Sequence, residues 1–159
     1  MTAAQRHWHG YIWTGPGKDL RNEFLRRPGA LGTPDRQEFM RSALPPLHLG
    51  HYLLRRTATT QDRTWTDPDE AIGWMASTYL QHPPLTGDGG FPAVAGWVPV
   101  ASDVGVEARR KTSRDALING VDASWGYWTS TGGAFVSYSA ICCPNTHFPE
   151  IPCPLPPRT

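Results

Sequence analysis

Two short stretches far apart in the sequence carry residues that could bind a metal ion. In the first, His7 and His9 flank a single tryptophan, Trp8. Residues two apart on a β-strand point to the same face, so both imidazoles could reach one ion. Histidine also titrates near neutral pH and can act as a general acid or base. The candidate catalytic histidines are His7, His9, His51 and His82.

The second stretch contains thiols and one imidazole, which are the ligands that zinc prefers. Its candidate metal ligands are Cys142, Cys143, His147 and Cys153. Adjacent residues on a strand point to opposite faces, so at most one of Cys142 and Cys143 should bind the ion, and a fourth ligand must come from elsewhere. Zinc or another divalent metal ion is therefore the candidate cofactor. The spacing is not that of a zinc finger. The alternative is that one cysteine is a small buried apolar residue and that the others have no special role in the tail.

The triplet at residues 7–9 resembles the His-hydrophobic-His motif of HUH endonucleases. In that family a divalent metal positions a phosphodiester for attack by a tyrosine on a helix. The resemblance implies a metal-dependent nuclease in which Tyr79 is the nucleophile and His51 or His82 completes the metal site. The alternative is a pair of surface or half-buried histidines on an edge strand.

Aromatic residues make up 11% of the chain, and seven of them are tryptophans. Tryptophan and tyrosine combine a large apolar area with one polar group, which suits pockets and interfaces. Those on or near predicted strands could line a ligand cavity or a partner interface, or they could fill the core. These candidate ligand-binding residues are Trp8, Trp13, Trp97, Trp125, Tyr127, Trp128 and Tyr138.

The elements that must position these residues can be predicted from their patterns. Residues 121–143 are rich in aromatic and β-branched side chains and predict a hairpin with its turn at residues 130–133. Asp67 and Pro68 form a helix start, as an N-cap and a first helical residue. Further strands are predicted at residues 7–13, 48–60 and 91–101. Helices are predicted at residues 19–27 and 67–81. Another helix should begin at Thr33, and a last one should end at Ile118.

This order of elements is typical of an α+β domain built on a largely antiparallel sheet. We expect a single domain over residues 1–143, followed by a proline-rich tail over residues 144–159 that extends over its surface or wraps it. Proline and glycine number 16 each, which predicts short elements and many turns.

Composition narrows the functional classes. The net charge of +1 creates no global attraction to nucleic acid or to an anionic membrane. The chain has no apolar run of the roughly 18 residues that can span a bilayer. Residues 1–13 have no basic region followed by an apolar core, so we expect no secretory signal. Thirteen of the fifteen basic residues are arginine, which is typical of a GC-rich bacterial genome such as an actinobacterial one. We expect a cytoplasmic protein.

No motif decides between an enzyme and a binding protein. The first hypothesis is a small-ligand-binding protein or minor enzyme of bacterial specialised metabolism, with an aromatic-lined pocket against the hairpin. The alternatives are the metal-dependent nuclease and a non-catalytic interaction module. The expected partners are a small molecule, another protein or a second copy of the chain.

Overall fold

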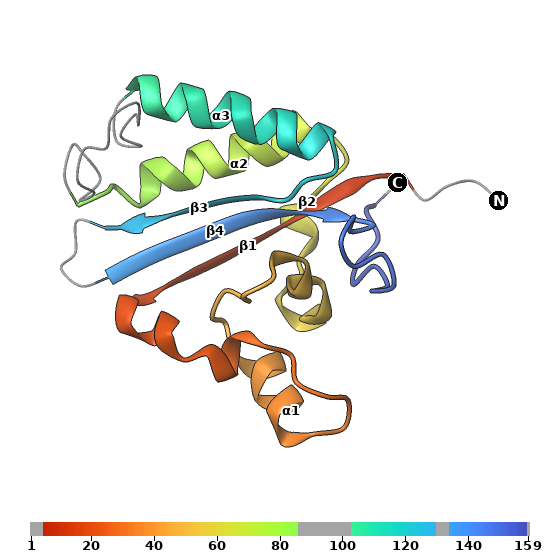
Figure 1. The fold of residues 1–159 in the computed structure, drawn as a ribbon. Helices are drawn as coiled ribbons and strands as arrows, with labels where there is room; N and C mark the ends of the chain where they lie inside the picture. The colour runs from red at the N-terminus through yellow and green to blue at the C-terminus, as the bar shows by residue number, and fades with distance from the viewer. Residues whose placement is uncertain (1–4, 86–102, 130–133, 159) are drawn as a thin grey trace.

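The computed structural model describes residues 5–85, 103–129 and 134–158. Its centre is a four-stranded antiparallel sheet, with two helices on one face and an irregular layer of chain on the other (Figure 1). The strand order is β2-β1-β4-β3, with bounds β1 His7–Pro16, β2 Thr64–Trp65, β3 Ala123–Trp128 and β4 Ala134–Cys143. The predicted α+β domain with an antiparallel sheet is confirmed. Trp97 and the predicted strand at residues 91–101 lie outside the described residues.

The long pair β1 and β4 forms the middle of the sheet. The two strands pair along their whole length, from His7 opposite Cys143 to Pro16 opposite Ala134. Strand β3 pairs with the other edge of β4, as the predicted hairpin requires. The start of β1 therefore lies beside the end of β4, although the two are far apart in the sequence.

Helices α2 (Pro68–Gln81) and α3 (Asp103–Ile118) pack side by side on one face (Figure 1). Helix α2 starts as predicted, because the Asp67 side chain accepts a hydrogen bond from the Asp69 backbone amide at 2.8 Å. Within the described residues, no helix is both long and apolar enough to cross a bilayer. The core under these helices contains Trp8, Ala71, Ile72, Met75, Leu117, Ala123, Trp125, Tyr127, Val136, Tyr138, Ala140 and Cys142.

The opposite face is covered by residues 17–63, in which the predicted strand at 48–60 is wrong. Besides α1 (Pro34–Arg41), this layer contains only short 3₁₀ helices among its regular elements. Their bounds are Gly17–Arg21, Glu23–Arg26, Leu49–Leu54, Arg56–Ala58 and Gln61–Arg63. The first two replace the predicted helix at residues 19–27, and the next two replace the predicted strand.

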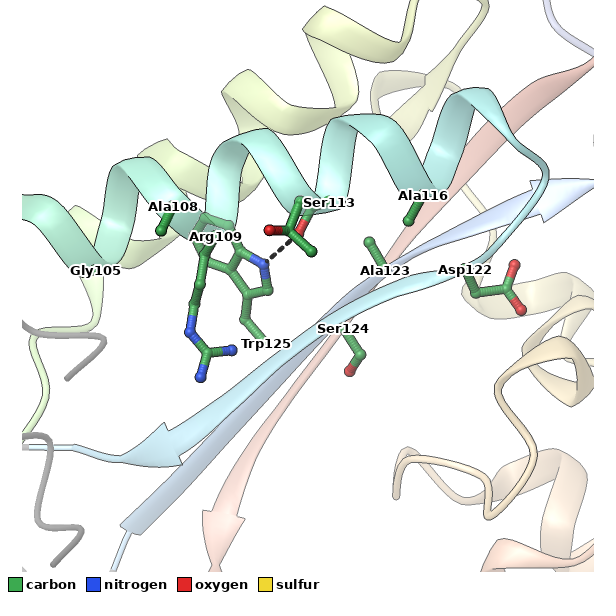
Figure 2. A pocket seen from close by; sticks show the side chains of 10 residues that line it. Gly105, Ala108, Arg109, Ser113, Ala116, Asp122, Ala123, Ser124 and Trp125 are labelled. Atoms are coloured by element: carbon green, nitrogen blue, oxygen red, sulfur yellow. Dashed lines mark hydrogen bonds between the residues drawn. The ribbon is translucent and has the colours of Figure 1, made fainter. Parts of the chain in front are cut away.

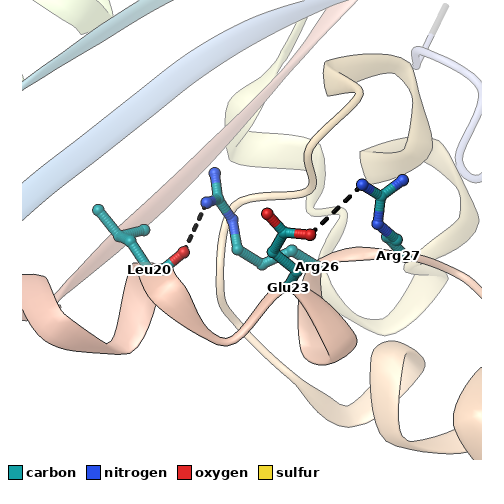
Figure 3. A network of polar contacts seen from close by, with 4 residues as sticks. All are labelled: Leu20, Glu23, Arg26 and Arg27. Atoms are coloured by element: carbon teal, nitrogen blue, oxygen red, sulfur yellow. Dashed lines mark hydrogen bonds and ion pairs between the residues drawn. The ribbon is translucent and has the colours of Figure 1, made fainter.

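Arginine side chains stabilise this layer by donating hydrogen bonds to backbone carbonyl oxygens. The Arg26 guanidinium donates to the carbonyl oxygen of Leu20 at 2.7 Å (Figure 3). It also donates to the carbonyl oxygen of Pro45 at 2.7 Å. Its neighbour Arg27 instead forms an exposed ion pair with Glu23 at 3.5 Å. In a sheet, backbone amides donate to the carbonyl oxygens of the neighbouring strand. In this layer, arginine side chains donate to the carbonyl oxygens of the irregular turns instead.

The proline-rich tail packs against one end of the sheet. Asn145 is 2% exposed, and its amide donates to the Asp122 carboxylate while its carbonyl oxygen accepts from the Phe148 amide. Farther along, the Gln61 side chain donates to the Pro156 carbonyl at 3.0 Å. These contacts hold the tail across the face that the irregular layer covers.

Candidate metal site

The two histidines of β1 lie on the face of the sheet turned away from α2 and α3. His7 and His9 are both buried, and their ring centroids are 4.9 Å apart. Trp8, between them, packs in the core beneath the helices. The two-residue period of a strand therefore places both imidazoles on one face, as predicted.

The neighbouring cysteines of β4 also point to opposite faces. Cys142 lies in the helix-side core, whereas Cys143 lies in a second cluster beneath the irregular layer. Cys143 is directly opposite His7 in the β1–β4 pairing. As predicted, the two cysteines point to opposite faces of the sheet, and only Cys143 lies on the face of His7 and His9.

The tail supplies the fourth group. Cys153 packs on the second cluster and brings its thiol to the two histidines. The ligand atoms of His7, His9, Cys143 and Cys153 all lie within 4.8 Å of one another, and all but Cys153 are buried. This group, which we call the His2Cys2 cluster, could hold a metal ion.

Hydrogen bonds fix the tautomer of both imidazoles. His7 Nδ1 lies 3.0 Å from the Gln5 carbonyl oxygen, which can only accept, so Nδ1 carries the proton. His9 Nδ1 lies 2.8 Å from Thr64 Oγ1, and the single hydrogen of that hydroxyl is donated to the Thr60 carbonyl at 2.7 Å. Thr64 must therefore accept from His9 Nδ1, which leaves a lone pair on each Nε2.

Both Nε2 atoms lie close to the sulfur of Cys153. The distances from Cys153 Sγ are 3.3 Å to His7 Nε2 and 3.7 Å to His9 Nε2. In tetrahedral zinc sites, Zn–S bonds of about 2.3 Å and Zn–N bonds of about 2.0–2.1 Å separate sulfur from nitrogen by roughly 3.6 Å. The two distances from Cys153 to the histidines are therefore close to those of a tetrahedral zinc site.

Burial favours the neutral form of these side chains. Burial, and then the neighbouring His7, lower the pKa of His9 to about 4, so its imidazole is neutral at pH 7. Burial, and then the neighbouring Cys153, raise the pKa of the Cys143 thiol to about 12. A metal ion must therefore displace a proton from Cys143, whereas His9 is ready to bind.

The depressed pKa of His9 predicts acid sensitivity of the metal-free protein. Unfolding restores the ordinary pKa near 6.5, so the unfolded chain binds a proton that the folded chain excludes down to pH 4. Stability contributed by neutral His9 is complete above pH 6.5 and is lost as the pH falls toward 4. We expect a loss of about 3 kcal/mol over this window, measured by urea unfolding with a chelator present. If His9→Gln lost as much stability over the same window, this origin of the effect would be wrong.

The other predicted metal and catalytic residues lie outside the cluster. His147 is exposed, and Cys142 is on the opposite face of the sheet. The His51 ring packs against the Phe148 ring, and their centroids are 4.3 Å apart. His82 follows the end of α2, where its carbonyl accepts from the Tyr127 hydroxyl, near the opposite end of the sheet from His7.

The structure does not bring Tyr79 to the histidines. Its ring packs against Tyr127 with centroids 5.8 Å apart, among the residues under α2 and α3. His7 and His9 face the other side of the sheet. The geometry implied by the resemblance to HUH endonucleases is therefore not assembled.

Most of the predicted aromatic site residues that are described belong to the core. Trp8, Trp125, Tyr127 and Tyr138 are buried under the helices. Trp13 and Trp128 are half-buried, and the Trp128 ring lies against Phe135 at 5.3 Å. As predicted, Trp125 and Tyr127 share one face of β3, and Trp128 lies on the other.

A groove of about 470 Å³ runs between α3 and the outer edge of β3 (Figure 2). Its polar lining includes Arg109, Ser113 and Ser124, and Trp125 is the aromatic residue among those that line it. The Trp125 indole donates to Ser113 Oγ at 2.9 Å, which fixes the ring beneath the groove. Small and polar residues, more than aromatic ones, thus form its walls.

Sequence patterns located all four members of the His2Cys2 cluster but split them between two hypotheses. The sequence patterns did not identify Thr64, which orients His9. Thr64 lies beside β1 in the two-residue strand β2, which is too short to give a strand pattern in the sequence.

Comparison of the chain with protein-family models, curated proteins and solved structures finds no match. The geometry of the site is therefore the basis for a functional proposal.

Proposed function

We propose that the chain is a zinc-binding protein whose His2Cys2 cluster holds one Zn²⁺ ion. The observation that carries this proposal is the convergence of four ligand atoms within 4.8 Å, with the Nε2 lone pairs of His7 and His9 facing Cys153. Two thiolates and two imidazoles form a typical zinc donor set. Two thiolates would neutralise the charge of the ion inside the buried site.

The number of protein ligands favours a structural role for the metal. Catalytic zinc sites keep one position for water or substrate, whereas structural sites are filled by four protein ligands. Here β1 supplies two ligands, β4 supplies Cys143 and the tail supplies Cys153. Zinc would fasten the tail to the sheet and stabilise the packing between them. In a reducing compartment such as the cytoplasm, where we expect the protein to be, both thiols would stay free to bind the ion.

Elemental analysis of the untagged protein, purified without chelator, tests this proposal. We expect about one equivalent of zinc, and we expect cobalt substitution to give the absorption of a tetrahedral thiolate site. Removal of the metal should lower the melting temperature and expose the tail to protease. Protein that contains no metal, takes up none after dialysis against zinc and keeps its melting temperature would contradict the proposal.

Thr64 should act as a positioning residue for the metal ligand His9. Thr64→Val keeps the shape of the side chain but removes the acceptor for His9 Nδ1–H, so the imidazole loses its fixed tautomer. Outer-shell substitutions of this kind cost roughly 10- to 100-fold in metal affinity. Competition with a chromophoric chelator measures the change. Thr64→Ser, which retains the hydroxyl, is the matched control and should bind zinc nearly as tightly as the wild type.

The groove between α3 and β3 supports a second candidate function, the binding of a small molecule. Its volume of about 470 Å³ lies within the range of ligand pockets, and Arg109 could contact an acidic group of the ligand. A metabolite screen by thermal shift should find ligands whose effect is lost in Arg109→Gln and retained in Arg110→Gln. Ligands that stabilise both variants equally would place binding elsewhere.

A further inference from the structure

A small cavity lies between β1 and the irregular layer, on the same face of the sheet as the His2Cys2 cluster. It is lined by the buried side chains of Tyr11, Tyr52 and Arg55 and by the exposed Thr57 and Ala58, so it reaches the surface. Its volume is about 160 Å³. Liquid water occupies about 30 Å³ per molecule, so the cavity has room for a small ion with part of its hydration shell. It is too small for a drug-sized ligand.

Arg55 brings a buried positive charge to this cavity. The side chain is 2% exposed and donates to the carbonyl oxygens of Leu25, Phe39 and Leu44 at 2.5–3.3 Å. A guanidinium has five N–H donors, so two remain without an acceptor in the described parts of the chain. No described carboxylate lies within ion-pair distance of Arg55. The guanidinium carbon lies 4.2 Å from the centroid of the Phe39 ring, which stabilises the charge in part. Buried charges are normally paired with an opposite charge as well, and Arg55 has no such partner among the described residues.

Tyr52 also lines this cavity and carries a buried donor. Its ring stacks on Tyr11 with centroids 4.4 Å apart, and the residue is 2% exposed. Its buried hydroxyl has no hydrogen-bond partner among the described residues. Such a group in a folded protein needs an explanation. An anion in the cavity could accept from this hydroxyl and from the free N–H groups of Arg55.

The charge of the surrounding layer also favours an anion. Residues 17–63 contain nine basic and five acidic residues, a net charge of +4, whereas the rest of the chain contains six basic and nine acidic residues, a net charge of −3. Arg63 lines the cavity, and its guanidinium makes one long hydrogen bond, at 3.4 Å, to the Thr60 hydroxyl. The positive field of the layer and the half-buried guanidinium of Arg63 would therefore both attract an anion to the cavity.

We propose that this cavity is an oxyanion site that binds a small tetrahedral anion of the phosphate or sulfate type. Arg55 and Tyr52 donate to the anion from inside the protein, and Arg63 contributes a second positive charge. The fork of a guanidinium matches two oxygens of such an anion. The site shares none of its proposed ligands with the His2Cys2 cluster, so it stands whether or not that cluster binds zinc.

Titration of the metal-loaded protein with inorganic phosphate, sulfate or chloride at constant ionic strength tests the proposal. Thermal unfolding and calorimetry should show saturable binding of phosphate and sulfate and no saturable binding of chloride. The sulfate arm separates binding in the cavity from extraction of the metal by phosphate. Equal effects of all three salts would show a general salt effect and overturn the proposal.

Tyr52→Phe gives a signature that damage to the fold cannot produce. In the absence of phosphate and sulfate it should melt at the same or a higher temperature than the wild type, because it removes a buried hydroxyl that has no partner. In their presence it should gain less stability than the wild type, because the anion loses one donor. If Tyr52→Phe kept the full response to phosphate and sulfate, the assignment of this cavity would be wrong.

Arg63→Gln and Arg21→Gln form a matched pair for the charge. Both remove one positive charge from the same layer, but Arg63 lines the cavity, whereas Arg21 lies on the exposed 3₁₀ helix Gly17–Arg21. We expect Arg63→Gln to weaken phosphate binding about tenfold, as for the loss of one charge-assisted hydrogen bond, and Arg21→Gln to weaken it much less. Equal weakening in both variants would indicate attraction to the whole layer and would overturn the site.

Discussion

Replacing Cys143 with alanine is expected to abolish stoichiometric zinc binding, whereas replacing its neighbour Cys142 with alanine leaves it intact. Both side chains are buried, at 1% and 0% exposure, so each substitution removes a similar apolar contact from a core. Only Cys143 faces His7 and His9. The comparison thus isolates coordination from packing, and elemental analysis of the two purified variants measures it.

The stability of the same two variants gives an independent measure. With zinc at roughly 100–1,000 times its dissociation constant, Cys143→Ala should be less stable than Cys142→Ala by about 3–4 kcal/mol, which is the binding energy that the folded state loses. With chelator present, the two variants should unfold at similar urea concentrations. A similar zinc content in both variants, or a stability gap that persists in chelator, would contradict the coordination by Cys143.

Trp125→Ala should cost the fold about 3–5 kcal/mol, as expected for a large aromatic residue in a core. The side chain is 1% exposed, its ring lies 5.9 Å from that of Tyr138, and its indole N–H donates to Ser113. Alanine would leave a cavity between α3 and β3 and a buried hydroxyl with one partner fewer. Urea unfolding of the metal-loaded protein measures the loss.

Trp128→Ala is the comparison within the same strand. Trp128 is half-buried on the opposite face of β3, where its ring packs against Phe135 and over Gly17. Its removal should cost about 1–2 kcal/mol, because only part of its apolar area leaves water on folding. Equal losses in the two variants would mean that the division of β3 into a core face and a half-exposed face is wrong.

The local geometry of the His2Cys2 cluster follows from the sequence, but its assembly does not. The two-residue period of a strand puts His7 and His9 on one face and separates Cys142 from Cys143. That period acts within a strand. The pairing of β1 with β4, which sets His7 opposite Cys143, depends on the packing of the whole sheet, and no spacing along the chain encodes it.

The layer over residues 17–63 shows where sequence patterns fail. The leucines and threonines of residues 48–60 fit a strand, yet Thr59 donates its hydroxyl to the Arg55 carbonyl four residues earlier. Such local side-chain bonds compete with a sheet ladder. Arg55 then satisfies carbonyls of three separate segments, which lets irregular turns be buried. Secondary-structure propensity does not reveal that one arginine side chain will donate hydrogen bonds to the backbone of several segments.

The pairing of β1 with β4 also sets when the protein can fold. His7 and Cys153, which meet in the site, are 146 residues apart in the sequence. During synthesis β1 leaves the ribosome first, and its partner on one side, β4, is made only after the helices. Contacts of such long sequence separation slow folding, and until they form β1 exposes an aromatic strand edge that can pair with other chains. Until β4 is complete, we expect the nascent chain to need chaperones, or a low concentration of other unfolded chains, to avoid aggregation.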